Sequence, residues 1–232
     1  MKPAEAKQRL AEAAVELGVA VLGVCEVGDL IERFHPEIRR QAESLPYAVS
    51  VAVELQPAIL RTITQFPTQV YKFHYRAANT RLDDITFRLS REISEMGGQA
   101  LPIPASKLMD RYPALAHLSH REIAHKAGLG WRGKNNLLVN PIYGSRLRLA
   151  TVLTDLELPP DTELTDGCGG CHACAKHCPA CAIGDTPEDF NLDPCRELLI
   201  RFSKENHLGH MICGFCLNWC PKHGKKETHR SE

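Results

Sequence analysis

The chain has 232 residues, of which 44% are hydrophobic, so it can bury a core and form one or two globular domains. Lysine plus arginine and aspartate plus glutamate number 28 each, which excludes a global charge that would attract nucleic acid or an anionic membrane. No apolar stretch approaches the roughly 20 residues that a membrane span needs. We therefore expect a soluble, cytoplasmic protein without a membrane partner.

The first half of the chain alternates between helical and strand-like patterns. Apolar residues at helical spacing predict helices, and short valine-rich runs predict buried strands. The pair Gly97-Gly98 is typical of a helix end. In chain order the pattern predicts a helix over Pro3–Leu17, strands at Val19–Val24 and Tyr47–Val53, a helix over Thr80–Met96 and a strand at Gln99–Ile103.

The second half begins with a capping box. Ser119 and Glu122 have the spacing that opens a helix, which we expect to end at Gly128. We expect the nearby His117, His120 and His125 to be solvated surface residues, because His120 and His125 cannot share a helical face. Further elements are predicted as strands at Leu137–Val139 and Leu147–Leu153, a linker at Thr154–Asp166, and a helix that Asp193-Pro194 starts.

These elements predict an α+β fold in two domains. Residues 1–158 form the α+β domain, and residues 159–224 form a domain like a two-cluster bacterial ferredoxin. The polar and charged end of the chain, residues 225–232, is expected to be a disordered tail.

Eight of the ten cysteines have the spacing of a two-cluster ferredoxin. They fall into two runs, each ending in a Cys-x-x-x-Cys-Pro element, and the last cysteine of each run is expected to bind the other run's cluster. A cubane presents four iron corners, and a tight loop can meet three of them. The predicted ligands are Cys168, Cys171, Cys174 and Cys220 for the first cluster, and Cys195, Cys213, Cys216 and Cys178 for the second.

Zinc and disulfides are the competing interpretations of these cysteines. Zinc prefers two Cys-x-x-Cys knuckles, whereas here three cysteines recur without a break between pairs. Disulfides are disfavoured because the charged residues Met1–Leu10 contain no signal peptide, and cytosolic thiols stay reduced. The remaining Cys25 and Cys181 are interpreted as small packed hydrophobes, or for Cys181 a spare thiol.

The segment Gly128–Asn136 imitates two nucleotide-binding motifs. It matches Gly-x-Gly-x-x-Gly and most of a phosphate loop, but both motifs need a strand before the glycines and a helix after them. Here the order is reversed. Two interpretations stay open: a helix end followed by a turn, or a backbone-lined binding surface with polar side chains from Lys134, Asn135 and Asn136.

This segment and the cysteine runs together resemble epoxyqueuosine reductase. The resemblance rests on Ala127–Asn135, Tyr143-Gly144-Ser145, Leu153-Thr154-Asp155 and the two runs. It implies two [4Fe–4S] clusters and a cobalamin held over the first cluster by a nitroreductase-like α/β-sandwich domain. Gly130, Trp131, Gly133, Lys134 and Asn135 would be cofactor-binding residues, and Asp110 of Asp110-Arg111-Tyr112-Pro113 would be the proton donor.

The chain departs from the family in three places. It ends soon after Cys220, where the family continues into helical repeats. Asp110 lies about one helical turn too far upstream, and residues Asn79–Arg81 replace an Asp-Tyr-His stretch. A turn-forming or capping role for Asp110 is therefore the competing interpretation.

The function predicted from all of this is that of a reductase. It would pass electrons from a donor of the ferredoxin or flavodoxin type, through two clusters, to a bound corrinoid or a substrate such as tRNA. The alternative is a dedicated electron-transfer protein that reduces a partner, for example a corrinoid protein.

Overall fold

The fold comes from a computed structural model, which describes residues 1–107, 109–111, 114–165, 167–205 and 207–221. The side chains at positions 110, 111, 114 and 115 are outside this description. The expected tail, residues 225–232, also lies outside the described residues.

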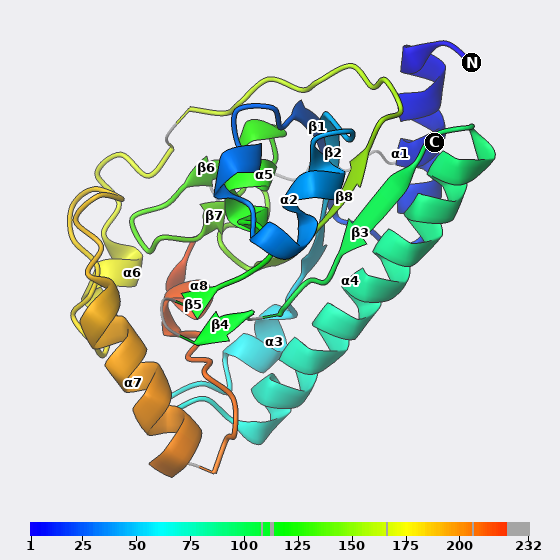
Figure 1. Ribbon diagram of the computed structural model, residues 1–232. Coiled ribbons are helices and arrows are strands. Elements are labelled where there is room, and N and C mark those ends of the chain that lie inside the picture. Colours follow the sequence, from blue (N-terminus) through cyan, green and yellow to red (C-terminus); the bar gives the residue numbers. More distant parts are fainter. Residues whose placement is uncertain (108, 112–113, 166, 206, 222–232) are drawn as a thin grey trace, which may run out of the picture. The chain divides into compact units, whose positions relative to one another are not determined.

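The fold mixes helices and strands (Figure 1). The helices are α1 (Pro3–Glu16), the short 3₁₀ helix η1 (Ile31–Arg33), α2 (Pro36–Ala42), α3 (Pro57–Leu60), α4 (Gln69–Glu95), α5 (His120–Lys126), α6 (Ala173–Lys176), α7 (Leu192–Glu205) and α8 (Phe215–Trp219). The strands are β1 (Val21–Glu26), β2 (Tyr47–Glu54), β3 (Ala100–Ile103), β4 (Asp110–Arg111), β5 (Ala114–Leu115), β6 (Trp131–Arg132), β7 (Leu138–Val139) and β8 (Leu147–Thr154). None of the described helices is both long and apolar enough to cross a membrane.

The chain divides into two compact units whose segments interleave along the sequence. The first unit contains residues 1–54, 75–129 and 148–164, and the second contains residues 55–74, 130–147 and 165–232. The last segment of the second unit starts close to the expected boundary at residues 158 and 159. The domain limits themselves stay a prediction.

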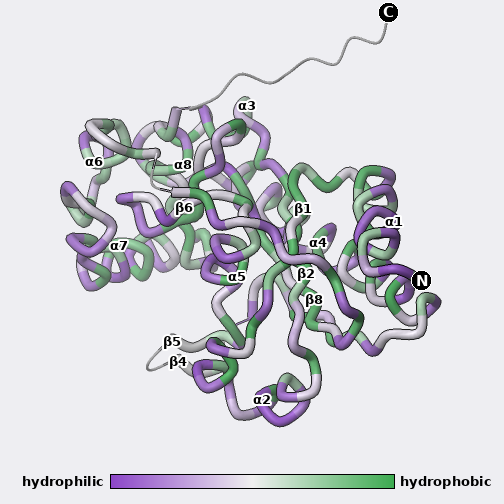
Figure 2. Tube along the Cα trace, turned by 90° about the horizontal axis from the view of Figure 1, so that it is seen from above, coloured by the Kyte–Doolittle hydropathy of each residue, from purple (hydrophilic) through white to green (hydrophobic). Residues whose placement is uncertain are grey.

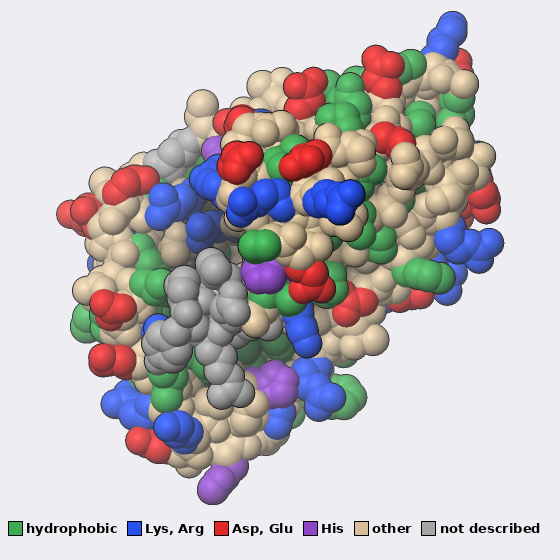
Figure 3. Space-filling model, in the orientation of Figure 1, with side chains coloured by type: hydrophobic (Ala, Val, Ile, Leu, Met, Phe, Trp, Pro, Cys, Tyr) green, Lys and Arg blue, Asp and Glu red, His purple; other side chains and the backbone are tan. Residues whose placement is uncertain are grey.

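The core of the first unit is a four-stranded sheet with the order β1-β2-β8-β3. β1 pairs antiparallel with β2, with Val24 opposite Val49, and β3 pairs antiparallel with β8. Helix α4 buries an apolar stripe, and its residues Leu82, Ile85, Leu89 and Ile93 are fully buried. Polar and apolar residues alternate in Figure 2 along α1, whose Arg9 bonds Glu92 of α4. On the face shown in Figure 3, acidic and basic side chains are interspersed.

Two helices begin earlier than their sequence patterns predict. α4 starts at Gln69 instead of Thr80, because Thr68 Oγ1 accepts a hydrogen bond from the Tyr71 N–H, as an N-terminal cap does. α7 starts at Leu192, because Asn191 Oδ1 accepts from the Asp193 N–H and caps the helix in place of Asp193. Both caps belong to residue types that also favour turns, so the sequence alone does not distinguish the two roles.

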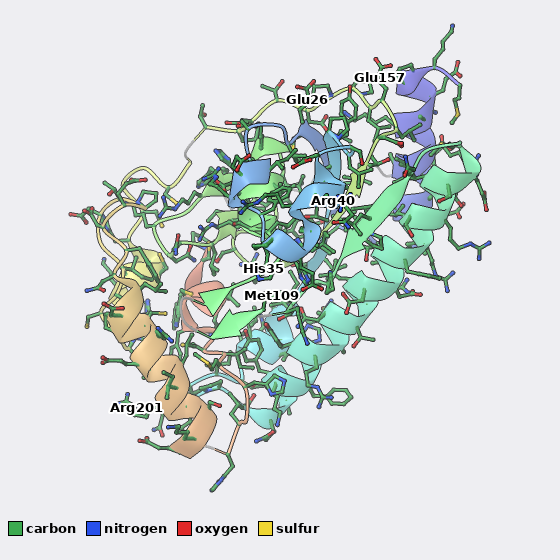
Figure 4. All side chains as sticks on the ribbon, in the orientation of Figure 1. Glu26, His35, Arg40, Met109, Glu157 and Arg201 are labelled. Carbon is green, nitrogen blue, oxygen red and sulfur yellow. The ribbon has the colours of Figure 1, made fainter. Side chains whose placement is uncertain are left out.

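The side-chain cap at the start of α5 is confirmed. The Ser119 side chain accepts a hydrogen bond from the Glu122 N–H, and Gly128 follows the helix with a φ of 72°. The expected solvation of His117 is wrong, because its side chain is buried. Its ring meets that of His35, which caps α2 (Figure 4), at a centroid distance of 6.2 Å.

His120 is half-buried and is expected to make the stability of the chain depend on pH. Its Nδ1 lies 2.8 Å from Thr151 Oγ1 and its Nε2 lies 3.0 Å from the Pro104 carbonyl oxygen. Burial lowers the pKa of His120 to about 4, below the value of about 6.5 for an exposed histidine. Between these values the unfolded chain binds more protons than the folded chain, so the free energy of unfolding falls as the pH falls.

From pH 7 to pH 5.5 we expect His120 to account for about 1 kcal/mol of this loss. Denaturant titrations at both pH values give the fall in the free energy of unfolding for the wild type and for His120→Asn. The difference between these two falls is the contribution of His120. Equal losses in the two proteins would contradict the prediction.

Candidate metal centre

The second unit contains the eight cysteines of the two runs. The first run lies in the loop before α6 and along α6, Cys195 lies on α7, and the second run leads into α8 (Figure 1). Helices α6 and α8 pack against each other, which brings the two runs together. All ten cysteines of the chain are free thiols.

Four of the thiols form a first set, made of Cys168, Cys171, Cys174 and Cys220. Burial, together with the nearby Cys220, Cys168 and Cys171, raises the pKa of Cys174 to about 11. Burial also raises the pKa of Cys220, with Cys168 as a neighbouring thiol. Cys220 comes from the end of the second run, so this neighbourhood joins the two runs.

The other four thiols form a second set, made of Cys178, Cys195, Cys213 and Cys216. Burial raises the pKa of Cys213 to about 12, with Cys195 and Cys178 as its neighbouring thiols. Burial also raises the pKa of Cys216 well above its ordinary value, and Cys213, Cys195 and Cys178 add to the rise. Cys216 has one neighbour in the first set, Cys174, so the two sets are adjacent.

These shifts have a chemical consequence. A buried thiolate without a positive partner is costly, so a thiol in such a place stays protonated. A bound metal replaces the proton and supplies the positive charge that stabilises the thiolate. The donor set is thus suited to metal.

The glycine-rich segment lies against the first set. Residues Gly133–Leu137 connect β6 to β7 in an antiparallel hairpin, with Trp131 opposite Val139. The Trp131 Nε1–H donates a hydrogen bond to Cys168 Sγ at 3.3 Å, and Lys134 Nζ donates to the Gly169 carbonyl at 2.7 Å. The backbone of this segment follows the first of the two open interpretations, a helix end followed by a turn. The side chains of Trp131 and Lys134 contact the cysteine loop.

The other predicted residues of this segment have supporting contacts. Asn135 Nδ2 donates a hydrogen bond to Ser145 Oγ at 3.1 Å, and both side chains are buried. A side chain at Gly130 would collide with the Val139 carbonyl, and one at Gly133 would collide with the Val139 side chain. The two glycines therefore let the hairpin close tightly.

The sequence pattern did not reveal three residues that contact Cys220. The Ser145 N–H donates to Cys220 Sγ at 3.2 Å, and Arg146 Nη1 donates to the Cys220 carbonyl at 2.6 Å. Gly144 has a φ of 58°, and a side chain there would lie 3.1 Å from Cys220 Sγ. The only sequence feature that pointed to these residues was the family resemblance, which Tyr143-Gly144-Ser145 carries in part.

A cavity of about 720 Å³ lies beside the cysteines in the second unit. This volume is typical of sites for small molecules and cofactors. The His177 and Trp219 rings stack at 3.7 Å on its wall, and Trp219 is 46% exposed. Its lining consists of Pro57, Arg61, Ile63, Thr64, Arg146, His177, Phe215, Asn218 and Trp219. Three of these side chains precede a cysteine directly: His177 before Cys178, Phe215 before Cys216 and Trp219 before Cys220.

Three predicted residues belong to neither set of thiols. Asp110 lies in β4, which pairs with β5, but its side chain is outside the described residues, so its role stays a prediction. Cys25 is buried in the first unit, as a small packed hydrophobe would be. Cys181 is exposed, with a φ of 47°, and the packed role expected for it is wrong.

Comparison with known proteins places the chain. No model of a known protein family matches it. It is 31% identical over 169 residues to epoxyqueuosine reductase of Leadbetterella byssophila, an alignment that covers 69% of this chain and 51% of that protein. The chain belongs to an epoxyqueuosine reductase-like family. It covers about half, or less, of the length of the curated epoxyqueuosine reductases that it matches.

Solved structures share the fold of this epoxyqueuosine reductase-like chain. Catabolic reductive dehalogenase NpRdhA has a TM-score of 0.76 at 20% identity, over 97% of this chain and 32% of that one. Epoxyqueuosine reductase from Streptococcus thermophilus has a TM-score of 0.62 at 21% identity, over 94% of this chain and 66% of that one. At these identities the likeness concerns the fold.

Proposed function

We propose that this chain is an iron–sulfur oxidoreductase with two [4Fe–4S] clusters. The first set of thiols would hold one cluster and the second set the other. The observation that carries the proposal is the grouping of the thiols, in which Cys220 neighbours the first run and Cys178 neighbours the second. This grouping supports the crossed ligation that two-cluster ferredoxins have.

The spacing of the cysteines supports clusters over zinc. Zinc prefers two Cys-x-x-Cys knuckles, whereas the first run places three cysteines with two residues between neighbours and ends in Cys-x-x-x-Cys-Pro. A cubane places each thiolate on a separate iron, and such a run can meet three of its irons.

The family supports a reductase that acts on a bound group. A reductive dehalogenase with the same fold is described as B12-dependent, and one epoxyqueuosine reductase structure contains an epoxyqueuosine-modified tRNA-Tyr stem loop. We therefore propose a corrinoid as a further cofactor and modified tRNA as the substrate class. When bound, a corrinoid supplies a strongly reducing, nucleophilic cobalt centre.

The cavity beside the cysteines has the chemistry to hold part of such a group. The stacked His177 and Trp219 rings, with Phe215, offer an aromatic wall, and Arg61 offers an exposed guanidinium for an anionic substituent. The His177 Nδ1 lies 2.8 Å from the Ala173 carbonyl oxygen, which fixes the orientation of its ring.

Cobalamin binding tests this proposal. We expect anaerobic protein to bind added cobalamin with a change in its visible spectrum, and Trp219→Ala to weaken the binding about tenfold through lost ring contact. Phe73→Ala is the control, because Phe73 is 74% exposed and does not line the cavity. Protein with intact clusters that binds no cobalamin would favour the alternative, a dedicated electron-transfer protein. Reduction of epoxyqueuosine-modified tRNA by the isolated chain would exclude that alternative.

A further inference from the structure

Two cationic side chains are buried in the described part of the chain, and both bond backbone carbonyls at or next to cysteines of the first set. Lys134 is 4% exposed and Arg146 is 6% exposed, and no other described lysine or arginine is buried. Lys134 Nζ bonds the carbonyl of Gly169, directly after Cys168, and Arg146 bonds the carbonyl of Cys220. A buried lysine is rare in proteins unless a negative group compensates it.

Lys134 makes no ion pair with a carboxylate of the described residues. Three ion pairs with carboxylates lie elsewhere in the described part of this unit: His172 with Asp185, Arg132 with Glu188 and Arg201 with Glu205. All three carboxylates are at least 68% exposed, so solvent screens them. The thiolates of the first set, once they bind a cluster, would supply the negative charge that compensates Lys134.

Hydrogen bonds add a second difference between the two sets. Each receives backbone N–H donors, such as Ser145 to Cys220 and Ala182 to Cys178. Among the described residues, the first set also receives a side-chain donor, the indole N–H of Trp131 on Cys168 Sγ. Hydrogen bonds to cluster sulfurs and nearby positive charge both stabilise the reduced cluster, which carries one more negative charge.

We propose that Lys134 and Trp131 raise the reduction potential of the cluster held by the first set above that of the cluster held by the second. This inference rests on the proposed function. One electron lost by the second cluster and gained by the first would then move downhill. Lys134 and Trp131 are positioning residues, which act on the potential of the cluster and need not touch a substrate.

An anaerobic redox titration followed by electron paramagnetic resonance tests the inference. The wild type should show two one-electron steps. We expect Lys134→Gln, which keeps a hydrogen-bond donor but loses the charge, to lower the equilibrium constant of the higher-potential step about tenfold, or about 59 mV for one electron. Lys176→Gln is the matched control, because Lys176 is exposed on α6 between Cys174 and Cys178. It should leave both steps unchanged.

Trp131→Phe provides a second variant, which keeps the ring and removes the N–H donor. It should lower the potential of the same step that Lys134→Gln affects, which is the higher-potential one. This variant tests the inference even if Lys134→Gln loses its iron. A shift of the lower-potential step, equal shifts of both steps, or no shift in a variant that retains its iron would overturn the inference. Wild-type protein without clusters would instead contradict the proposed function.

Discussion

Cys213→Ala is expected to lower the iron content from about eight to about four atoms per chain, because one [4Fe–4S] cluster loses a ligand. Cys213 lies in the second set, and its neighbouring thiols are Cys195 and Cys178. Cys171→Ala should give the same fall in iron by removing a ligand of the first cluster. Iron and sulfide assays on anaerobically purified protein measure both results.

Cys181→Ala is the matched control for these two variants. Cys181 is exposed and follows the first run by three residues, so it shares the local sequence without belonging to either set. It should retain about eight irons. If Cys181→Ala lost half of the iron, or if Cys213→Ala retained all of it, the proposed ligand sets would be wrong.

Gly144→Ala is expected to disrupt the first cluster without removing any ligand. The φ of 58° at Gly144 costs a residue with a side chain about 1–2 kcal/mol. A Cβ there would also lie 2.7 Å from the Pro221 carbonyl oxygen and 3.1 Å from Cys220 Sγ. The backbone that presents Cys220 would have to move, so we expect about half of the iron to be lost.

Gly169→Ala separates this contact from backbone strain. Gly169 also has a positive φ, of 42°, but a Cβ there would meet no atom within 4 Å. We expect Gly169→Ala to lower the free energy of unfolding by only about 1 kcal/mol and to retain the iron. Similar iron contents in the two variants would show that contact with Cys220 does not matter.

The sequence predicted those parts of the centre that depend on local spacing. The runs from Cys168 and Cys213 predicted which thiols would be neighbours, and the pattern at Ser119 and Gly128 predicted a capped helix before the glycine-rich segment. Local spacing also gave β1, β2, β3, β7 and β8 to within a few residues.

The contacts that surround the cysteines could not be predicted in this way. Ser145 and Arg146 reach Cys220 across about 75 residues of chain, and the cavity joins Pro57 to Trp219. Such contacts depend on tertiary packing, for which a single sequence has no periodic signal. Lys134 was predicted as a polar group for a cofactor. In the structure it is buried and donates a hydrogen bond to the Gly169 carbonyl, a contact that the motif did not suggest.

The metal content of anaerobically purified wild-type protein tests the central claim most directly. We predict about eight irons and about eight sulfides per chain, with the broad visible absorption of [4Fe–4S] clusters, which dithionite bleaches. Stoichiometric zinc without sulfide, or a colourless protein whose iron does not exceed a trace after anaerobic reconstitution, would contradict the two-cluster account.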